Sequence, residues 1–226
     1  MARSGGYGFG IVGCGMIANF HAQAIVAMKG GHLEGFCSRT ANRAGEMAEK
    51  YGVRQYSTWD ALLADQRVDI VVVATPSGAH LDIALAAANA GKHIICEKPL
   101  EITLERVEKM IAAAEKNSVL LAGIFQSRYN EATIALKKAA DAGRFGQLTD
   151  ASAYIKWHRP QSYYDSGAWR GTWALDGGGC LMNQGIHTID LLMHLAGDVS
   201  SVVAFADRIA HDRIEVEDSA VAALKF

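Results

Sequence analysis

The chain has 226 residues, of which 50% are hydrophobic and 20% charged, so it holds enough apolar side chains for one large or two modest globular cores. The formal net charge of -2, with both signs interspersed, excludes a basic stripe for nucleic acid and a polybasic segment for a membrane surface. No apolar run is long enough to span a bilayer, and glycines interrupt the N-terminus before a signal-peptide core forms, so we expect a cytoplasmic protein with a small-molecule partner.

The first half of the chain alternates short apolar runs with longer helical patterns, which is typical of βαβ units around a buried parallel sheet. The stretch 81–91 is rich in Ala and Leu, and 104–117 carries apolar residues at helical spacing, so both predict helices packed on that sheet. We therefore predict an α/β, doubly wound Rossmann domain for NAD(P) binding over residues 1–125. Its strands are expected at 9–13, 32–38, 69–75, 92–96 and 119–125.

The rhythm changes near Gln126. These later elements predict a C-terminal α+β domain over residues 126–226, for substrate binding and oligomerisation, with a large open, mostly antiparallel sheet. Because the final run stops inside an apolar strand, without a turn or polar tail, we expect this domain to be incomplete. The expected elements are a helix at 132–143, an aromatic strand at 147–159, a loop rich in Trp, Tyr and Gly, a helix from about Cys180 to Ala196, and strands at 199–209 and 218–226.

A dinucleotide-binding fingerprint, GCGMIA, follows the first expected strand and opens a helix. Gly13 permits the tight turn, Gly15 lets the backbone approach a pyrophosphate, and Ala18 is small enough for close packing of helix on strand. The phosphates are expected at the helix N-terminus, beside Met16 and Ile17, where free N–H groups and the helix dipole favour negative charge.

The second expected strand ends without the Asp or Glu that commonly holds the ribose hydroxyls of NAD. Ser38 and Arg39 stand there instead. Arg39 could pair with a 2′-phosphate, which favours NADP slightly over NAD, whereas its alternative role is a solvated surface charge.

Neither a metal centre nor a disulfide framework is expected. The histidines and acids show no ligand spacing. Cys14, Cys37, Cys96 and Cys180 lack paired spacing, and we expect reduced thiols.

Four segments, taken in order, resemble the glucose-fructose oxidoreductase / inositol dehydrogenase / MocA (Gfo/Idh/MocA) oxidoreductase family over nearly the whole chain. They are GCGMIA (13–18), ATPSGAH (74–80), EKPL (97–100) and DGGGCLMNQGIHTID (176–190). The resemblance implies an NAD(P)-dependent dehydrogenase or reductase that transfers a hydride between the nicotinamide and a sugar, sugar-derivative or polyol carbon. For a complete chain it also implies a homo-oligomer, a dimer or tetramer.

By this resemblance, Lys98 and His187 are the catalytic residues that move the hydroxyl proton, and Pro99 follows a cis peptide bond. A Lys beside a cationic nicotinamide can exchange a proton near neutral pH. Asn183 stands where inositol-oxidising members carry an Asp, so it can bind a hydroxyl but cannot act as a base. Asp190, with Asn183, shares a helix face with His187.

The resemblance also implies the remaining contacts. The cofactor contacts are Gly13, Gly15, Met16, Ile17, Ser38, Arg39, Thr75, Pro76, His80, Glu97, Lys98, Gln126, Trp169 and Arg170, and the substrate contacts are Asn183, Tyr163 and Asp190. Tyr163, Tyr164, Lys156 and His158 could line a sugar pocket, although ordinary packing explains these aromatic residues equally well.

Three alternatives stay open at this point. One is a glycosidase-like enzyme of the same superfamily that retains NAD and shows no net cofactor turnover. Another is a non-catalytic, cofactor-sensing regulator on the same fold, against which the presence of both Lys98 and His187 argues. The third is a fragment that binds cofactor without turning over.

Overall fold

The computed structural model describes residues 6–226. The chain divides into two compact units at the step from Ile124 to Phe125. We call them the N-terminal unit and the C-terminal unit, and each is described by itself.

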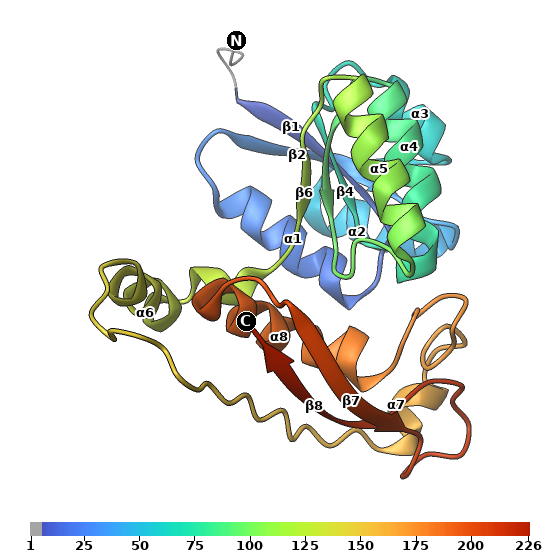
Figure 1. Ribbon diagram of the computed structural model, residues 1–226. Helices are drawn as coiled ribbons and strands as arrows, with labels where there is room; N and C mark the ends of the chain where they lie inside the picture. The colour runs from blue at the N-terminus through green and yellow to red at the C-terminus, as the bar shows by residue number, and fades with distance from the viewer. Residues whose placement is uncertain (1–5) are drawn as a thin grey trace. The chain divides into compact units, whose positions relative to one another are not determined.

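The N-terminal unit is built around a six-stranded sheet in which every neighbouring pair of strands is parallel (Figure 1). The strand order is β3-β2-β1-β4-β5-β6, so the direction of winding reverses between β1 and β4. This confirms the predicted doubly wound fold. The strands are β1 (Tyr7–Val12), β2 (Gly31–Cys37), β3 (Arg54–Tyr56), β4 (Ile70–Val73), β5 (His93–Cys96) and β6 (Leu121–Gly123). The helices are α1 (Met16–Ala27), α2 (Ala41–Tyr51), α3 (Trp59–Ala64), the 3₁₀ turn η1 (Ser77–Ala79), α4 (His80–Asn89) and α5 (Leu104–Lys116).

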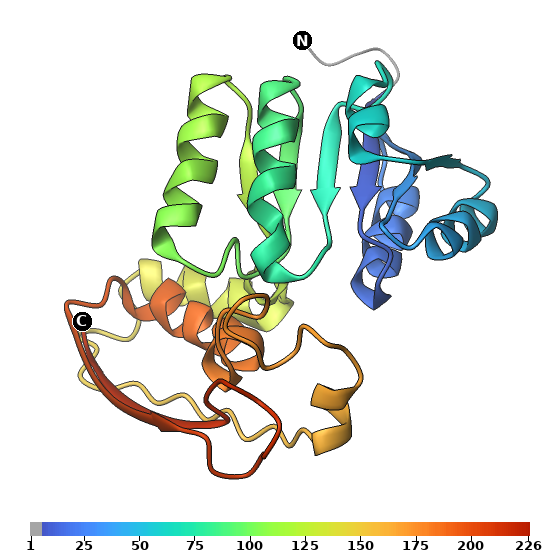
Figure 2. The same cartoon turned by 90° about the vertical axis from the view of Figure 1, so that its right-hand side faces the viewer.

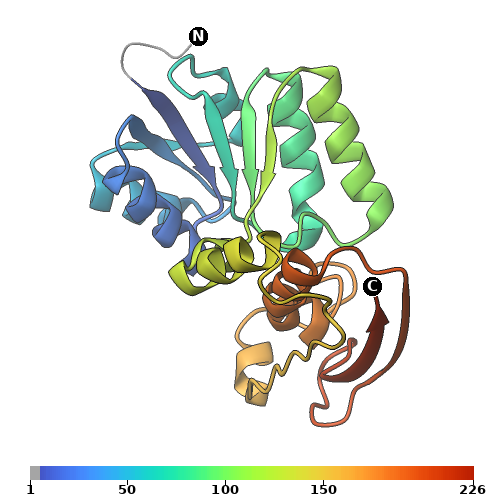
Figure 3. The ribbon, with the colours of Figure 1, turned by 60° about the vertical axis from the view of Figure 1, so that its left-hand side comes forward.

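Helices cover both faces of this sheet, which is why its central strands are apolar without alternation. On one face α3, α4 and α5 pack on side chains such as Val71 and Val73, and Figure 2 shows α4 and α5 side by side there. On the other face α1 and α2 pack on Ile11, Phe36 and Val72. Figure 3 separates the blue helices α1 and α2 from the green α4 and α5, with the strands between them.

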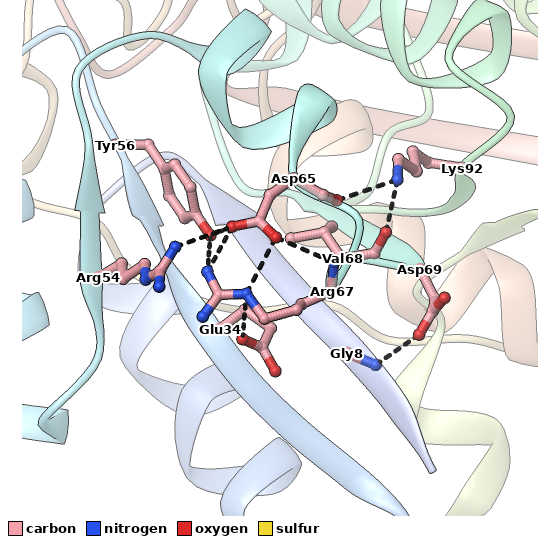
Figure 4. Close-up of polar contacts among 9 residues, drawn as sticks. All are labelled: Gly8, Glu34, Arg54, Tyr56, Asp65, Arg67, Val68, Asp69 and Lys92. Atoms are coloured by element: carbon pink, nitrogen blue, oxygen red, sulfur yellow. Dashed lines mark hydrogen bonds and ion pairs between the residues drawn. The ribbon is translucent and has the colours of Figure 1, made fainter. Parts of the chain in front are cut away.

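An ionic cluster outside the fingerprint ties α3 to the sheet, centred on Asp65 (Figure 4). Asp65 accepts hydrogen bonds from the Arg67 side chain and from the hydroxyl of Tyr56 at 2.8 Å. The Arg67 hydrogen bonds hold the pKa of Asp65 well below its usual range, and burial raises the pKa of Tyr56 to about 12. Lys92 donates to the Asp65 and Val68 carbonyls, which fastens the same loop to the turn before β5.

This cluster predicts a loss of stability in acid. Because the pKa of Asp65 is lower in the folded chain, its contribution is complete above the ordinary aspartate pKa and is lost as the pH falls toward the folded value. The variant Asp65→Asn is expected to lower the free energy of unfolding by about 1 to 3 kcal/mol at pH 7 and to flatten its dependence on pH below about 5. Urea unfolding followed over pH checks this, with the exposed Glu108→Gln as control. An unchanged acid slope in Asp65→Asn would contradict it.

The C-terminal unit has less regular structure. Its elements are the 3₁₀ turn η2 (Gln126–Tyr129), α6 (Glu131–Asp141), α7 (Gln161–Asp165), the π-helix η3 (Cys180–Gly185), α8 (Ile186–Ala196), β7 (Ser201–Asp207) and β8 (Ser219–Lys225). The helix expected from about Cys180 to Ala196 is present, with its first turn wound as a π-helix. Strands β7 and β8 pair antiparallel, as expected for this unit.

Two expectations for this unit need correction. Residues 147–159 form no strand, because they find no partner strand for their backbone groups, and Figure 1 shows them as a long extended segment between α6 and α7. Within the described residues, the antiparallel sheet of this unit therefore has two strands and is not large. Aromatic and β-branched content favours an extended backbone, but a strand also needs a neighbour.

None of the helices described between residues 6 and 226 combines the length and the apolar character that crossing a membrane requires.

Candidate functional site

Four loops of the N-terminal unit meet at the carboxyl edge of its parallel sheet. Gly13 follows β1, Ser38 follows β2, Thr75 lies just beyond β4, and Glu97 and Lys98 follow β5. Backbone hydrogen bonds join these strand ends: Gly13 N–H donates to the Cys37 carbonyl, Ala74 to Val12, and Glu97 to Val73, at 2.8, 2.8 and 3.0 Å. Within the N-terminal unit, the structure therefore brings these five predicted cofactor residues together, beside the point where the winding reverses.

The turn after β1 requires glycine at one position and leaves open space at another. Gly13 has φ of +105°, and a Cβ added there would lie 2.3 Å from the Ala74 carbonyl oxygen. Gly15 has φ of -83°, and an added Cβ would meet no atom within 4 Å. The turn is thus tight at its first glycine and accessible at its second.

Helix α1 begins directly after this turn and has no side-chain cap. Its first N–H groups have no intrahelical partner, and Met16, which carries one of them, is 78% exposed. Uncapped N–H groups at the positive end of a helix dipole suit an anion such as a pyrophosphate.

Thr75 supplies a second sign that this edge accommodates a polar ligand. Its hydroxyl oxygen is buried and has no hydrogen-bond partner among residues 6–226. A buried hydroxyl without a partner is costly, so a ligand that hydrogen-bonds to it would be stabilised. A Cβ added at Gly13 would lie 3.0 Å from the Thr75 backbone nitrogen, so Thr75 lies directly against the glycine turn. The open Gly15, the uncapped helix and this hydroxyl together fit a dinucleotide.

His80 lies deeper than the other residues of this edge and is only 1% exposed. Its Nε2 is 2.9 Å from the Thr75 carbonyl oxygen, and its Nδ1 is 3.1 Å from that of Pro99 and 3.2 Å from that of Leu100. The ring bridges the loop after β4 and the loop after β5, so His80 positions both loops from inside. Pro76 lies in the loop after β4, immediately before η1.

Glu97 is buried and joins the loop after β5 to helix α1. Its Oε1 is 2.8 Å from His21 Nε2, and its Oε2 accepts from the Lys98 N–H at 3.2 Å. Burial raises the pKa of Glu97, but the hydrogen bonds from His21 and from the Lys98 backbone outweigh it, so the pKa lies below its usual value. Glu97 is thus a carboxylate that fixes the backbone of Lys98, which is itself half-buried. The Lys98–Pro99 peptide bond is cis, as the resemblance implies.

A buried carboxylate that the sequence did not single out holds the same two loops. Glu101 accepts hydrogen bonds from Arg106 and from the backbone of Leu81 and Ile102. Burial raises the pKa of Glu101, but the hydrogen bonds from Arg106 and the backbone outweigh burial, so the pKa lies below its usual value. Arg106 also donates to the Gly78 carbonyl at 3.1 Å. This network therefore ties the turn η1 to the start of helix α5.

At the end of β2, Arg39 is exposed, and its side chain has no ion-pair partner among residues 6–226. Ser38 accepts a hydrogen bond from the Thr40 N–H at 3.2 Å, which shapes the turn. The guanidinium of Arg39 is therefore available to a ligand charge.

In the C-terminal unit, Asn183 is oriented by a buried carboxylate. Its amide nitrogen donates to Asp176 Oδ1 at 2.8 Å, and the Gly171 N–H donates to Asp176 Oδ2 at 2.9 Å. Asp176 is 2% exposed. Asn183 belongs to η3, and His187 follows in the first turn of α8, so the two predicted residues stand on consecutive turns. Sequence reasoning missed Asp176, although it opens the same DGGG segment.

Asp190 is engaged by a cation from another element. Arg128 of η2 donates to its two carboxylate oxygens, at 2.8 and 2.5 Å. The pair fastens α8 to η2, the turn that also carries the exposed Gln126. The structure therefore gives Asp190 a role in holding the His187 helix in place.

Glu217, just before β8, holds the start of η3. Its carboxylate accepts from the N–H groups of Gly179 and Leu181, at 3.0 and 3.1 Å. Its backbone carbonyl accepts from the Cys180 N–H at 2.9 Å. A carboxylate at the start of a helix is favourable for the dipole, so the sheet of this unit fixes the segment that leads to His187.

The aromatic residues predicted near the site divide between packing and stacking. Tyr164 is buried against Ile214 and Val216. Tyr163 is half-exposed and lies under the Arg170 guanidinium, whose carbon is 4.2 Å from the Tyr163 ring centre and 4.6 Å from that of Trp169. Lys156 and His158 are exposed on the extended segment.

Comparison with known proteins accounts for almost the whole chain. Residues 7–125 match the family model "Oxidoreductase family, NAD-binding Rossmann fold", and residues 133–226 match the "GFO/IDH/MocA C-terminal domain". Inositol 2-dehydrogenase from Salmonella typhimurium is 32% identical over 168 residues, which are 70% of this chain and 50% of that protein.

Solved structures give the same result. The WlbA dehydrogenase from Bordetella pertussis, in complex with NADH and UDP-GlcNAcA, is 37% identical with a TM-score of 0.92, over 100% of this chain and 65% of that one. A levoglucosan dehydrogenase in complex with NADH and levoglucosan is 27% identical with a TM-score of 0.85, over 98% of this chain and 64% of that one. The chain thus spans half the length of the inositol dehydrogenase and under two thirds of these two structures.

Proposed function

Because the chain belongs to the Gfo/Idh/MocA oxidoreductase family, we propose that it forms the cofactor-binding and part of the substrate-binding portion of an NAD(P)-dependent dehydrogenase or reductase acting on a sugar or polyol. The observation that carries the proposal is the carboxyl edge of the parallel sheet, where an open glycine, an uncapped helix and a buried hydroxyl without a protein partner lie together. The relatives crystallised with NADH and a sugar support it.

In this proposal the N-terminal unit holds the dinucleotide. The N–H groups of Met16 and Ile17, reached across Gly15, bind the pyrophosphate, and Ser38 and Arg39 face the adenosine ribose. Thr75, Pro76, Glu97 and Lys98 contact the nicotinamide half, with His80 supporting them from inside, and Gln126, Trp169 and Arg170 add contacts from the C-terminal unit. When bound, the nicotinamide supplies the hydride acceptor or donor.

The residues of this chain supply the proton chemistry. Lys98 and His187 exchange the proton of the reacting hydroxyl, because a neutral amine and a neutral imidazole can each accept a proton that their charged forms return. Asn183 and Tyr163 form hydrogen bonds with the substrate, and Asp176 orients the Asn183 amide. Asp190 keeps α8 in place through its ion pair with Arg128. The C-terminal unit is accordingly the substrate-binding and oligomerisation domain.

Arg39 carries our proposal that NADP is slightly preferred over NAD. Replacing it with Asp is expected to weaken NADPH binding about tenfold to a hundredfold, since a charge-assisted contact to the 2′-phosphate is lost and repulsion is added. NADH binding should stay the same or improve. Fluorescence titration with both cofactors checks this, and Lys29→Asp, exposed beyond the C-terminal end of α1 and so away from the glycine turn, is the control. An unchanged ratio of the two affinities would remove Arg39 from the site.

The compartment and the assembly are also proposals. All four cysteines are free thiols, which suits the reducing cytoplasm. Strands β7 and β8 expose Val203, Phe205 and Val221, which supports contact with further protein in a homo-oligomer, a dimer or tetramer.

The activity is tested on the protein that contains this chain, by following nicotinamide absorbance with NAD and NADP against neutral sugars, sugar acids, nucleotide sugars and inositols. The proposal predicts cofactor reduction with at least one class. A flat trace with every class, from a protein that binds NADH in the same titration, would count against it.

A further inference from the structure

Two arginines and three aromatic rings form a cluster within the C-terminal unit. The Arg159 guanidinium carbon is 4.9 Å from the Tyr163 ring centre and 5.7 Å from that of Trp157. Arg170 stacks on the same Tyr163 ring at 4.2 Å. Two positive groups therefore share one aromatic ring. The ring attracts each guanidinium, but it does not cancel the repulsion between them.

No carboxylate among residues 6–226 pairs with either guanidinium, although other arginines of the same unit are paired. Arg128 binds Asp190 and Arg213 binds Asp165. In addition, the Nε of Arg159 is buried and has no hydrogen-bond partner within the described chain. A buried guanidinium N–H without an acceptor, beside a second unpaired cation, is a site suited to an anion.

The backbone carbonyl of Arg159 is held by His211, which is itself held by Asp218. His211 Nε2 is 2.7 Å from the Arg159 carbonyl oxygen, and His211 Nδ1 is 2.8 Å from Asp218 Oδ2. Asp218 accepts in turn from the N–H groups of Ile209 and Ala210. The loop before β8 thus fixes the Arg159 backbone, and the Trp157 and Tyr163 rings contact its guanidinium, which lowers the entropy lost on binding a ligand.

The cluster adjoins the segment that leads to His187. The Gln184 amide donates to the Tyr163 hydroxyl at 3.4 Å, and Gln184 lies next to Asn183 in η3. Arg170 precedes Gly171, whose N–H donates to the same Asp176 that orients Asn183. Hydrogen bonds therefore connect the cluster, through Gln184 and Gly171, to the segment that carries the residues assigned to the substrate.

We propose that Arg159 binds a negatively charged group of the substrate, so that the substrate is a sugar bearing a carboxylate or a phosphate and not a neutral polyol. This rests on the proposed function, because it names the substrate class of the same site. The forked donors of a guanidinium match two oxygens of a carboxylate or phosphate. Arg170, which also stacks on Trp169, keeps its proposed role as a cofactor contact.

Calorimetric titration of the protein that contains this chain tests the proposal. The probes are UDP-glucuronate, UDP-glucose, glucuronate and myo-inositol, which carry both charged groups, phosphates alone, a carboxylate alone and no charge. At least one charged probe should bind about tenfold or more tightly than myo-inositol, and which of them does so identifies the charged group. Equal affinity for charged and neutral probes would overturn the proposal.

The variant Arg159→Gln should weaken the charged probe about tenfold to a hundredfold and leave NADH affinity within about twofold. Arg159→Lys, which keeps the charge but not the fork, should recover part of the loss, and Arg144→Gln, exposed elsewhere in the same unit, should lose nothing. A loss of NADH affinity in Arg159→Gln, or an equal loss in Arg144→Gln, would overturn the assignment.

Two further measurements keep the outcome clear. Should Arg159→Gln fail to fold, the wild-type protein alone decides, since its affinity for the charged probe should fall as salt is raised and its affinity for myo-inositol should not. Probe binding without any cofactor reduction would remove the proposed function and leave the anion site standing, whereas reduction with neutral polyols alone would do the reverse.

Discussion

Replacing Lys98 with Met is expected to lower kcat by about two to four orders of magnitude, because methionine keeps the length and apolar stem but cannot exchange a proton. The loop should survive the change, since Glu97 holds the Lys98 backbone through its N–H and not through the side chain. The affinity for NADH should remain within about threefold, because the glycine turn and helix α1 carry most of the dinucleotide. Steady-state kinetics and an NADH titration measure the two quantities.

Lys109→Met is the matched control, because Lys109 is exposed on α5 of the same unit and pairs with Glu105 one turn away. It should keep the wild-type kcat. Full turnover in Lys98→Met would show that another group moves the proton, and an equal loss of NADH binding would show that Lys98 is chiefly a cofactor contact.

Alanine at the two glycines of the turn should separate folding from binding. Gly13→Ala is expected to lower the free energy of unfolding by about 2 to 4 kcal/mol, because the left-handed backbone is strained for alanine and its Cβ meets the Ala74 carbonyl. Gly15→Ala should change it by less than about 1 kcal/mol, since the new Cβ meets nothing and φ is ordinary. Denaturant unfolding measures both.

The substitution at Gly15 should instead affect the cofactor. Gly15→Ala should fold normally and still weaken NADH about tenfold or more, because its methyl group occupies the space through which the pyrophosphate approaches the helix. Wild-type affinity in Gly15→Ala would place the pyrophosphate elsewhere, and wild-type stability in Gly13→Ala would mean that the turn relaxes without cost.

The fold of the N-terminal unit could be predicted from the sequence because most of its strands are short apolar runs and its helices repeat apolar residues at helical spacing. Strand β3, three residues long, carries too little pattern to be seen. The segment 147–159 failed for the opposite reason: its aromatic pattern suits a strand, but pairing depends on residues far along the chain.

The candidate site was readable only where its residues sit in local motifs. Gly13, Gly15 and Lys98 belong to short patterns, whereas His21 meets Glu97 from 76 residues away and Arg128 meets Asp190 from 62. Such partners leave no local signal, because folding alone brings them together. The interior place of His80 was equally hidden, since a histidine at the start of a helix reads the same whether its ring turns outward or inward.

Hydride transfer itself is the central claim, and isotope transfer tests it most directly. A sugar substrate carrying deuterium at the reacting carbon is incubated with the protein and oxidised cofactor, and the reduced cofactor is examined by mass spectrometry and NMR. The account predicts one deuterium on C4 of the nicotinamide for each substrate oxidised. Deuterium released to water, or returned to the product without net reduced cofactor, would contradict it.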